Sequence, residues 1–423
     1  MRYRFSHKIK SWIRLLSLTL SAQFLIQAIG LLGGIIIIRF LNKEEYAYYT
    51  IANTMLGTMT ILADGGISQA VLSQGGKNWN YREQFSKVVV TGLKLRRQFA
   101  IGSLILAIPI LGYILHNNDA NLGTIILIVI AIIPAFYTSL SDTIYQIALK
   151  LHQDIKPLQI NQLMVGFSRF ILVVGLSIVT PFSYVFLLID GVTKYFGNLR
   201  LKRLSKKSVD YEMTEDLEVR AEMLKLVRRI LPASLYFCFY SQITVWLISF
   251  FGTTEKVAEI GALSRLTVAT ASLSIVFSVL ITPRYAKLPN DYNALLSKFT
   301  QVLLLSILIC GGMIITVYFT SDFLLWILGN DYKSLNIELV LLFFANGLAL
   351  ISGFIYALYV SRGWMIKPYI YIPINFITLA CCVFYFDMNE LVGVIFVNII
   401  VNFVMFLINL IYCYYKIFNL REN

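Results

Sequence analysis

The chain of 423 residues has few charges for its length, and this scarcity excludes most soluble architectures. Charged residues make up 14% of it and hydrophobic residues 58%, and the mean hydropathy is +0.72. A water-soluble domain carries about a quarter charged residues. Too few charges are therefore present to cover a water-facing surface, and the composition predicts an integral membrane protein.

The chain also lacks the residue patterns that most enzyme sites need. Its three histidines are scattered without metal-ligand spacing, and its five cysteines all fall inside apolar runs, where we expect them to pack as small apolar side chains. No GxxxxGK[ST], HExxH or GxSxG motif is present. We therefore expect a protein that is not an enzyme and that holds no metal and no cofactor.

Long apolar runs are what the chain does have, and about 20 apolar residues suffice to cross a membrane as a helix. Helices are required because lipid tolerates only backbone whose hydrogen bonds are made internally. We predict an all-α membrane protein with about 12 transmembrane helices. Nine of the expected spans are Leu15–Ile38, Gln98–Leu115, Leu122–Leu140, Ile230–Phe251, Leu266–Ile281, Phe299–Thr320, Leu339–Val360, Pro368–Phe386 and Leu391–Tyr415.

The other three expected spans contain charged residues. Tyr46–Leu72 contains Asp64, Pro157–Thr180 contains Arg169, and Phe182–Leu199 contains Asp190 and Lys194. The basic N-terminus followed by an apolar run has the look of a signal peptide. We predict a retained first helix instead, because the run is long enough to span and has no small-residue cleavage site.

The distribution of Lys and Arg predicts the orientation. The net charge is +13, but the basic residues lie in short loops between apolar runs, which favours membrane orientation over nucleic-acid binding. With both termini on the cytoplasmic side, 30 of the 36 basic residues face the cytoplasm. We expect a multi-pass membrane protein with both termini on the cytoplasmic side.

The longest polar stretch divides the expected helices into six and six. We predict an N-terminal lobe over residues 1–199, a cytoplasmic linker over 200–229 and a C-terminal lobe over 230–423. The linker is either a solvated charged segment or, in part, a helix lying on the membrane surface. Duplicated halves are common in secondary transporters, with a substrate site between them.

Charges within spans are costly and usually face a cavity or pair with each other. The functional interpretation is that Arg169, Arg265, Arg39 and Lys194 line a cationic cavity, since guanidinium groups bind phosphate through two hydrogen bonds. The structural interpretation is pairing, or snorkelling at helix ends.

Three acidic residues are candidates for binding a coupling ion or for pairing: Asp64, Asp142 and Asp190. Asp190 and Lys194 are spaced i,i+4 and can pair directly. For Asp64 pairing with an arginine is the favoured interpretation.

Three short segments resemble a known family. Arg39-Phe-Leu-Asn-Lys-Glu-Glu-Tyr-Ala-Tyr-Tyr49 resembles the "R-x-L-x-x-x-E-[YF]-G-x-Y" pattern of polysaccharide flippases, with Ala47 in place of the usual glycine. Leu62-Ala-Asp-Gly-Gly-Ile-Ser68 resembles their "x-x-D-x-G-[IL]" segment, and Trp326-Ile-Leu-Gly-Asn-Asp-Tyr332 their "L-x-G-x-x-[YF]" segment. The chain is thus similar to O-antigen or capsule repeat-unit flippases of the Wzx type, in the multidrug/oligosaccharidyl-lipid/polysaccharide exporter superfamily.

The resemblance implies two six-helix lobes around a central cavity. The implied substrate is an oligosaccharide on undecaprenyl diphosphate. The resemblance implies that it moves from the inner to the outer leaflet of a bacterial cytoplasmic (inner) membrane by alternating access, for surface polysaccharide (lipopolysaccharide O-antigen or capsule) synthesis. The implied partners are this lipid-linked oligosaccharide, membrane lipids and the polysaccharide polymerase and chain-length proteins, with no nucleic acid. Coupling to a proton or sodium gradient stays open.

Two alternatives belong to other classes. A drug/cation antiporter of the same superfamily would need a carboxylate-rich cavity, whereas the mid-span charges here are mostly basic. A membrane glycosyltransferase or polymerase usually needs a larger outer domain or an early acidic pair, and neither is visible in the sequence.

Overall fold

The computed structural model describes residues 2–289 and 291–420, with the side chains of these residues except 2–20, 269, 279, 280 and 283. Every regular element in this part of the chain is a helix. The chain forms two compact units, Met1–Gln242 and Ile243–Asn423. The helices up to the unit boundary are α1 (Arg2–Phe40), α2 (Lys43–Asp64), α3 (Ile67–Asn78), α4 (Arg82–Asn117), α5 (Leu122–Leu151), α6 (Ile155–Ser177), α7 (Ser183–Ser205) and α8 (Leu217–Phe251), in which the boundary falls.

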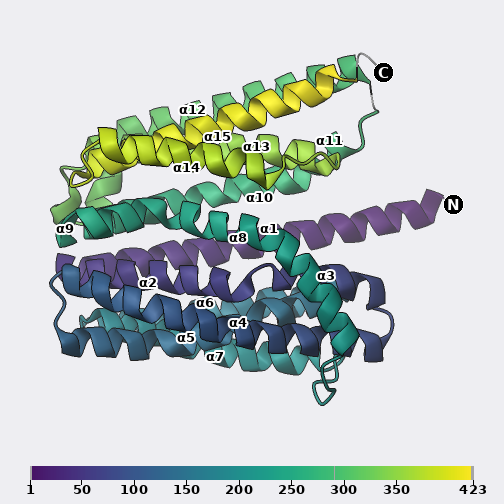
Figure 1. The fold of residues 1–423 in the computed structure, drawn as a ribbon, viewed down its shortest axis with the longest axis horizontal. Coiled ribbons are helices and arrows are strands. Elements are labelled where there is room, and N and C mark those ends of the chain that lie inside the picture. The colour runs from purple at the N-terminus through teal and green to yellow at the C-terminus, as the bar shows by residue number, and fades with distance from the viewer. Residues whose placement is uncertain (1, 290, 421–423) are drawn as a thin grey trace. The chain divides into compact units, whose positions relative to one another are not determined.

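The remaining helices belong to the second unit (Figure 1). They are α9 (Thr254–Thr267), η1 (Val268–Thr270), α10 (Ala271–Leu280), α11 (Thr282–Ala286), α12 (Tyr292–Leu328), η2 (Asn330–Tyr332), α13 (Asn336–Ser361), α14 (Pro368–Tyr385) and α15 (Leu391–Phe418).

Among the described residues, ten helices are long and apolar enough to cross a membrane, and the bent pair α2–α3 makes an eleventh span if it is counted as one. The twelfth expected span is α7, a helix of 23 residues that is more polar than the others. The prediction of an all-α membrane protein with about twelve spans is confirmed. The helices extend beyond the apolar cores seen in the sequence: α4 begins at Arg82 and not at Gln98, since helical backbone continues into its polar end.

One of the expected transmembrane spans is not a single continuous helix in the structure. The sequence predicted a helix over Leu266–Ile281, but α9 ends at Thr267 and a tighter turn precedes α10. The hydroxyl of Thr267 donates to the carbonyl of Ser264 at 2.9 Å, and that of Thr270 donates to the carbonyl of Thr267 at 2.6 Å. Such bonds compete with the helix ladder and bend it.

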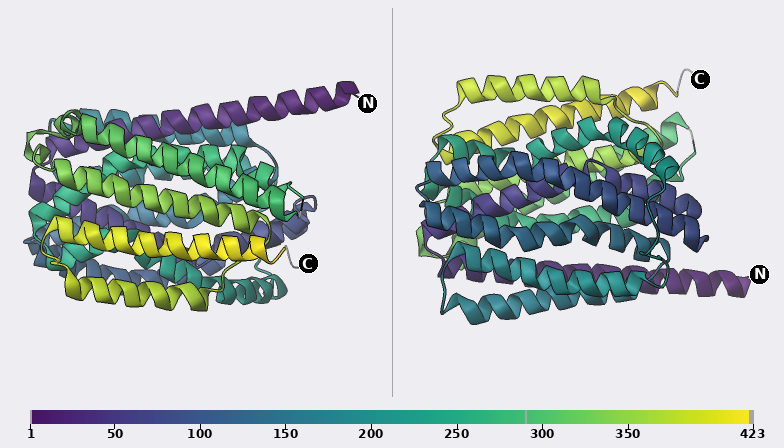
Figure 2. Two further views of the ribbon diagram at one scale, coloured as in Figure 1. Left: turned by 90° about the horizontal axis from the view of Figure 1, so that it is seen from above. Right: turned by 60° about the horizontal axis from the view of Figure 1, so that its bottom comes forward.

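In the first unit, α5 packs on α7, α1 on α6 and α2 on α4. These helices run alongside one another, and the further views keep them so (Figure 2). Gly191 of α7 explains how closely α7 approaches α5. A Cβ atom at this position would come within 2.9 Å of the Ala135 backbone nitrogen, so the glycine lets the two backbones approach.

The break between α2 and α3 is a bend of 46°. Gly65 and Gly66 form it, with φ of 50° and 94°, which glycine adopts without strain. The Asp64 carboxylate accepts a hydrogen bond from the backbone N–H of Ser68 at 3.2 Å. It therefore caps the start of α3 from the end of α2.

The polar stretch expected as a linker over 200–229 is mostly helical. Helix α7 continues to Ser205, α8 begins at Leu217, and only residues 206–216 lie outside helices. This segment is fastened to α4: the backbone N–H of Asp216 donates to Thr91 Oγ1 at 3.1 Å, and Lys94 Nζ lies 2.7 Å from Glu215 Oε1. The Lys94 hydrogen bond lowers the pKa of the Glu215 carboxyl.

In the second unit, α13 packs against α12 and α15, and α15 against α14 (Figures 1 and 2). Its core includes a hydrogen-bonded polar group among apolar side chains. The Tyr359 hydroxyl donates to Asn409 Oδ1 at 2.9 Å, and Asn409 Nδ2 donates to Ser352 Oγ at 2.9 Å. Buried polar groups are tolerated when they are paired in this way.

Candidate functional site

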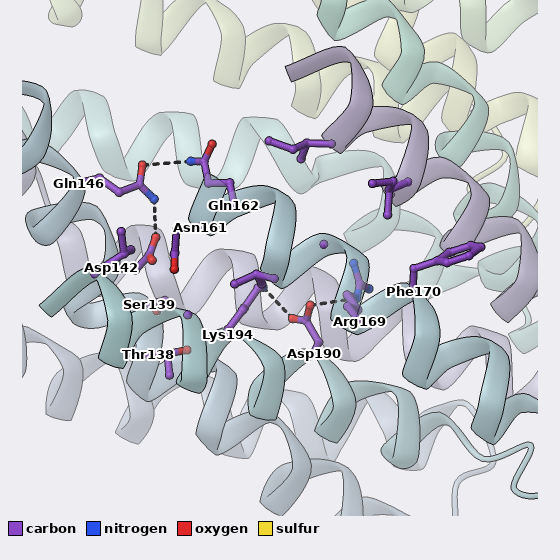
Figure 3. Close-up of a pocket in the computed structure, with 18 of the residues that line it drawn as sticks. Thr138, Ser139, Asp142, Gln146, Asn161, Gln162, Arg169, Phe170, Asp190 and Lys194 are labelled. Atoms are coloured by element: carbon purple, nitrogen blue, oxygen red, sulfur yellow. Dashed lines mark hydrogen bonds and ion pairs between the residues drawn. The ribbon is translucent and has the colours of Figure 1, made fainter. Parts of the chain in front are cut away.

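A polar cavity of about 500 Å³ lies within the first unit, lined by α1, α2, α5, α6 and α7 (Figure 3). Glycines on α1 leave room for it: Gly30 and Gly33 both line the cavity, and no other atom comes within 4 Å of a Cβ built on Gly30. The volume lies in the range of about 300–1,000 Å³ typical of small-molecule sites. A polar cavity inside an apolar bundle is a binding-site candidate.

One face of each of two helices supplies most of the polar lining. On α5 the cavity-facing residues include Thr138, Asp142 and Gln146, at i, i+4 and i+8. On α6 they include Asn161, Val165 and Arg169 at the same spacing. This periodicity places all three residues of each set on one side of the helix.

Arg169, Asp190 and Lys194 form an ion-paired group that we call the Arg169 cluster. Arg169 Nε lies 3.2 Å from Asp190 Oδ1, and Lys194 Nζ lies 2.6 Å from Asp190 Oδ2. The Asp190 side chain is 6% exposed, against 28% for Arg169 and 47% for Lys194. Arg169 also donates from Nη2 to the Tyr49 hydroxyl at 3.2 Å. One buried carboxylate thus holds two basic groups at the cavity wall.

Asp142 lies beyond this cluster and is held differently. Its Oδ2 accepts a hydrogen bond from Gln146 Nε2 at 2.6 Å, and among the described residues no basic group lies within ion-pair distance of it. Lys194 and Arg96 act on it electrostatically from farther away. Along the cavity in Figure 3 the charges alternate, from Asp142 through Lys194 and Asp190 to Arg169. The lining of this cavity is therefore not uniformly cationic.

A chain of amide side chains leads to Asp142. Gln23 Nε2 donates to Gln162 Oε1 at 3.1 Å, and Gln162 Nε2 donates to Gln146 Oε1 at 3.5 Å. Gln146 then donates to Asp142. We name Asp142, Gln146, Gln162, Gln23 and Asn161 the amide cluster.

A comparison with protein-family models shows to which family this chain belongs. Residues 36–336, more than half of the chain, match the family described as polysaccharide biosynthesis protein. The chain belongs to this polysaccharide biosynthesis family. A comparison with curated protein sequences found no match.

Solved structures show that this family member has the fold of a known transporter superfamily. A multidrug resistance MATE family transporter of the MOP superfamily, in an inward-facing conformation, superposes with a TM-score of 0.71 at 12% identity, covering 94% of this chain and 96% of that one. The lipid II flippase MurJ, in an inward closed conformation, superposes with a TM-score of 0.73 at 15% identity, covering 95% and 89%. At these identities the likeness shows the fold alone.

A third structure comes from Pyrococcus furiosus. It is a MOP superfamily transporter described as having a binding pocket of reversed polarity, and it superposes with a TM-score of 0.58 at 14% identity, covering 97% of this chain and 96% of that one.

The structure of this polysaccharide biosynthesis protein places the remaining predicted site residues outside the cavity lining. Arg39 is exposed in the last turn of α1, and Arg265 lies partly buried at the end of α9, in the second unit. Asp64 ends α2 and pairs with Arg96 of α4, whose Nη2 lies 3.4 Å from Asp64 Oδ1. The Arg96 side chain is 2% exposed, so Asp64 supplies the charge that this buried guanidinium needs.

Four of the seven predicted site residues line the cavity: Arg169, Lys194, Asp142 and Asp190. Sequence reasoning missed the amides Gln23, Gln146, Asn161 and Gln162. On α5 the recurrence of polar residues at i, i+4 and i+8 was the signal that could have found Gln146, and on α6 it was the spacing of two turns between Asn161 and Arg169. Over the described residues, no three His, Cys, Asp or Glu side chains converge in the manner of a metal site.

Proposed function

We propose that this polysaccharide biosynthesis protein is a flippase for oligosaccharide repeat units linked to undecaprenyl diphosphate. It moves them by alternating access from the inner to the outer leaflet of a bacterial cytoplasmic membrane, for O-antigen or capsule synthesis. In this proposal both termini face the cytoplasm, and the chain passes its product to a polysaccharide polymerase and chain-length proteins. It carries out no covalent chemistry itself.

The Arg169 cluster is the observation that carries the proposal. Two basic side chains share one carboxylate at the wall of a polar cavity, so the cluster keeps a net positive charge. A guanidinium offers paired N–H groups that match phosphate oxygens. This chemistry suits the diphosphate that joins a saccharide to its lipid carrier, and the family description as a polysaccharide biosynthesis protein agrees with such cargo.

Arg39 and Arg265 extend the same proposal. Both lie outside the described cavity lining, and we assign them contacts with the anionic headgroup at other stages of its passage. Asp142 and Asp190 are the cavity carboxylates that a coupling proton or sodium ion would neutralise, whereas Asp64 is engaged by Arg96.

A drug/cation antiporter is the second candidate, and one observation favours it. Asp142 faces the cavity without a basic group at ion-pair distance among the described residues, and the MATE multidrug transporters share the fold. The Arg169 cluster weighs against it, because two adjacent cations repel a cationic drug.

A deletion strain tests the proposal. Without a repeat-unit flippase, its substrate should stay on the side where it is made. We therefore expect carrier-linked repeat units to accumulate on the cytoplasmic leaflet, and the amount of surface polysaccharide to decrease. Mass spectrometry of the lipid extract measures the first effect. Unchanged lipid-linked intermediates, together with new sensitivity to cationic drugs, would support the antiporter. Accumulation of single repeat units outside the membrane would support a polymerase.

A further inference from the structure

The amide cluster lies at the Asp142 end of the cavity, and the Arg169 cluster does not explain its chemistry. Asn161 is the key residue. It lines the cavity, it is 3% exposed, and its Oδ1 atom has no hydrogen-bond partner among the described residues. A buried carbonyl without a donor is costly. That oxygen is shielded from the cavity, so the group that the side chain offers a bound molecule is Nδ2, which donates no hydrogen bond within the described chain.

The neighbours of Asn161 lead to a hydrogen-bond acceptor on Asp142. Gln162, next to it in sequence, is hydrogen bonded to Gln146, which is hydrogen bonded to Asp142 through Oδ2 only. The second carboxylate oxygen, Oδ1, accepts no hydrogen bond within the described chain. This end of the cavity therefore presents an oxygen acceptor on Asp142 together with amide N–H donors.

Two hydroxyl groups of the lining add further acceptors. Thr138 donates its hydroxyl proton to the carbonyl of Ala135 at 2.9 Å, and Ser139 donates to the carbonyl of Phe136 at 2.6 Å. With their protons directed at their own helix, these hydroxyls have only lone pairs to offer to a ligand. A molecule bound here must therefore both donate hydrogen bonds to these oxygens and accept them from the amide N–H groups.

We propose that the amide cluster is a saccharide subsite, which binds the uncharged, hydroxyl-rich part of the cargo while the Arg169 cluster binds its diphosphate. This inference rests on the proposed function. A sugar ring carries several hydroxyl groups, and each donates one hydrogen bond. An amide N–H donates to one sugar hydroxyl while a carboxylate oxygen accepts from another, so Asn161 and Asp142 together match a ring that carries several hydroxyls.

The charge distribution separates the two subsites. A diphosphate offers only acceptors, and at this end of the cavity it would meet the carboxylate of Asp142. A saccharide avoids this conflict. The cavity of about 500 Å³ has room for a few sugar rings. The subsite therefore binds part of a repeat unit. The specificity for one glycan over another then resides in Asn161, Gln162 and Gln146.

Two lipid probes test this subsite on the purified full chain. One is undecaprenyl diphosphate, and the other is undecaprenyl diphosphate carrying the host's own repeat unit, extracted from the deletion strain. We expect Asn161→Leu, which is close in shape but cannot hydrogen bond, to bind the saccharide-bearing probe about tenfold more weakly. Its affinity for the sugar-free probe should be unchanged. Thr138→Val should act in the same direction, more weakly.

Asn375→Leu is the matched control. Asn375 of α14 is also buried, at 2% exposure, and its Oδ1 also lacks a partner among the described residues, but it does not line this cavity. We expect this variant to bind both probes as the unmodified protein does. The sugar-free probe serves as the folding control for Asn161→Leu and for the smaller replacement Asn161→Ala.

Three outcomes overturn the subsite. Equal weakening of both probes by Asn161→Leu assigns the residue to the headgroup or to the fold. Unchanged binding of both probes removes Asn161 from recognition. A changed sodium dependence, with saccharide discrimination intact, makes the cluster a cation site instead. Failure of the unmodified protein to bind either probe would contradict the proposed function itself, which keeps the two failures distinguishable.

Discussion

At the scale of single residues, Asp190 decides what Arg169 and Lys194 can do. Asp190 is buried and reaches both basic side chains. It stabilises their charges within an apolar bundle, where an unpaired charge is expensive. Because two cations share one carboxylate, the cluster still attracts an anion. Arg169 therefore has two possible roles, structural partner of Asp190 or ligand of a phosphate, and substitutions can separate them.

We predict that Arg169→Met lowers the affinity for undecaprenyl diphosphate by roughly ten- to a hundredfold, the size of one or two charge-assisted hydrogen bonds. Equilibrium binding to the purified protein measures this. The double variant Arg169→Met with Asp190→Asn restores the net positive charge of the cluster through Lys194 but not the guanidinium, and we expect it to fold normally yet bind as weakly as the single variant. Recovery of binding in the double variant would show that Arg169 serves only to neutralise Asp190.

The sequence located the charges at this scale but not their partners. Arg169, Asp190, Lys194 and Asp142 stand out because charges are rare in apolar spans. The i,i+4 spacing also predicts the Asp190–Lys194 contact. The contact between Arg169 and Asp190 joins α6 to α7, and no local spacing predicts which helices meet. Asn161 and the glutamines went unnoticed because a single amide in a span is common and only their convergence is informative.

At the scale of elements, Gly65 and Gly66 determine the position of the bend between α2 and α3. The sequence predicted one span over Tyr46–Leu72, because its apolar residues continue past the glycines. The backbone shows instead two consecutive residues with positive φ. Asp64 binds across the break to Ser68 and to Arg96 of α4. The bend is thus fixed by the ion pair between Asp64 and the buried Arg96 as well as by glycine.

We predict that Gly66→Ala destabilises the first unit by about 1–3 kcal/mol. Its φ of 94° strains any residue with a side chain, and a Cβ atom would come within 2.8 Å of Ile230 Cγ2. A lower midpoint of thermal unfolding in detergent is the expected result.

Gly76→Ala is the control, since this α3 glycine has open space around it and is not among the residues with positive φ. It should be neutral or stabilising by about 0.5–1 kcal/mol. Equal effects of the two substitutions would contradict a conformational role for Gly66.

At the scale of the whole molecule, hydropathy predicted the fold class because spanning a membrane leaves few alternatives. The presence of each transmembrane helix could be predicted from the length of its apolar run. This includes α7, whose charged residues Asp190 and Lys194 line the cavity. Helix ends did not follow, because polar residues continue the helices past the apolar cores, as at Arg82 of α4. The orientation given by Lys and Arg and the division into six plus six helices stay predictions. The family match over residues 36–336 adds what no physical pattern carries, the link to polysaccharide biosynthesis.

The central claim is that this chain moves a saccharide linked to a lipid diphosphate from one leaflet to the other. The most direct measurement places the purified protein in vesicles that contain the carrier-linked repeat unit, and follows exposure of the saccharide to a glycosidase that does not cross the membrane. We predict that the unmodified protein exposes the inner-leaflet saccharide much faster than protein-free vesicles do, and that Arg169→Met slows this exposure. Exposure at the protein-free rate, with a correctly inserted chain, would contradict the account.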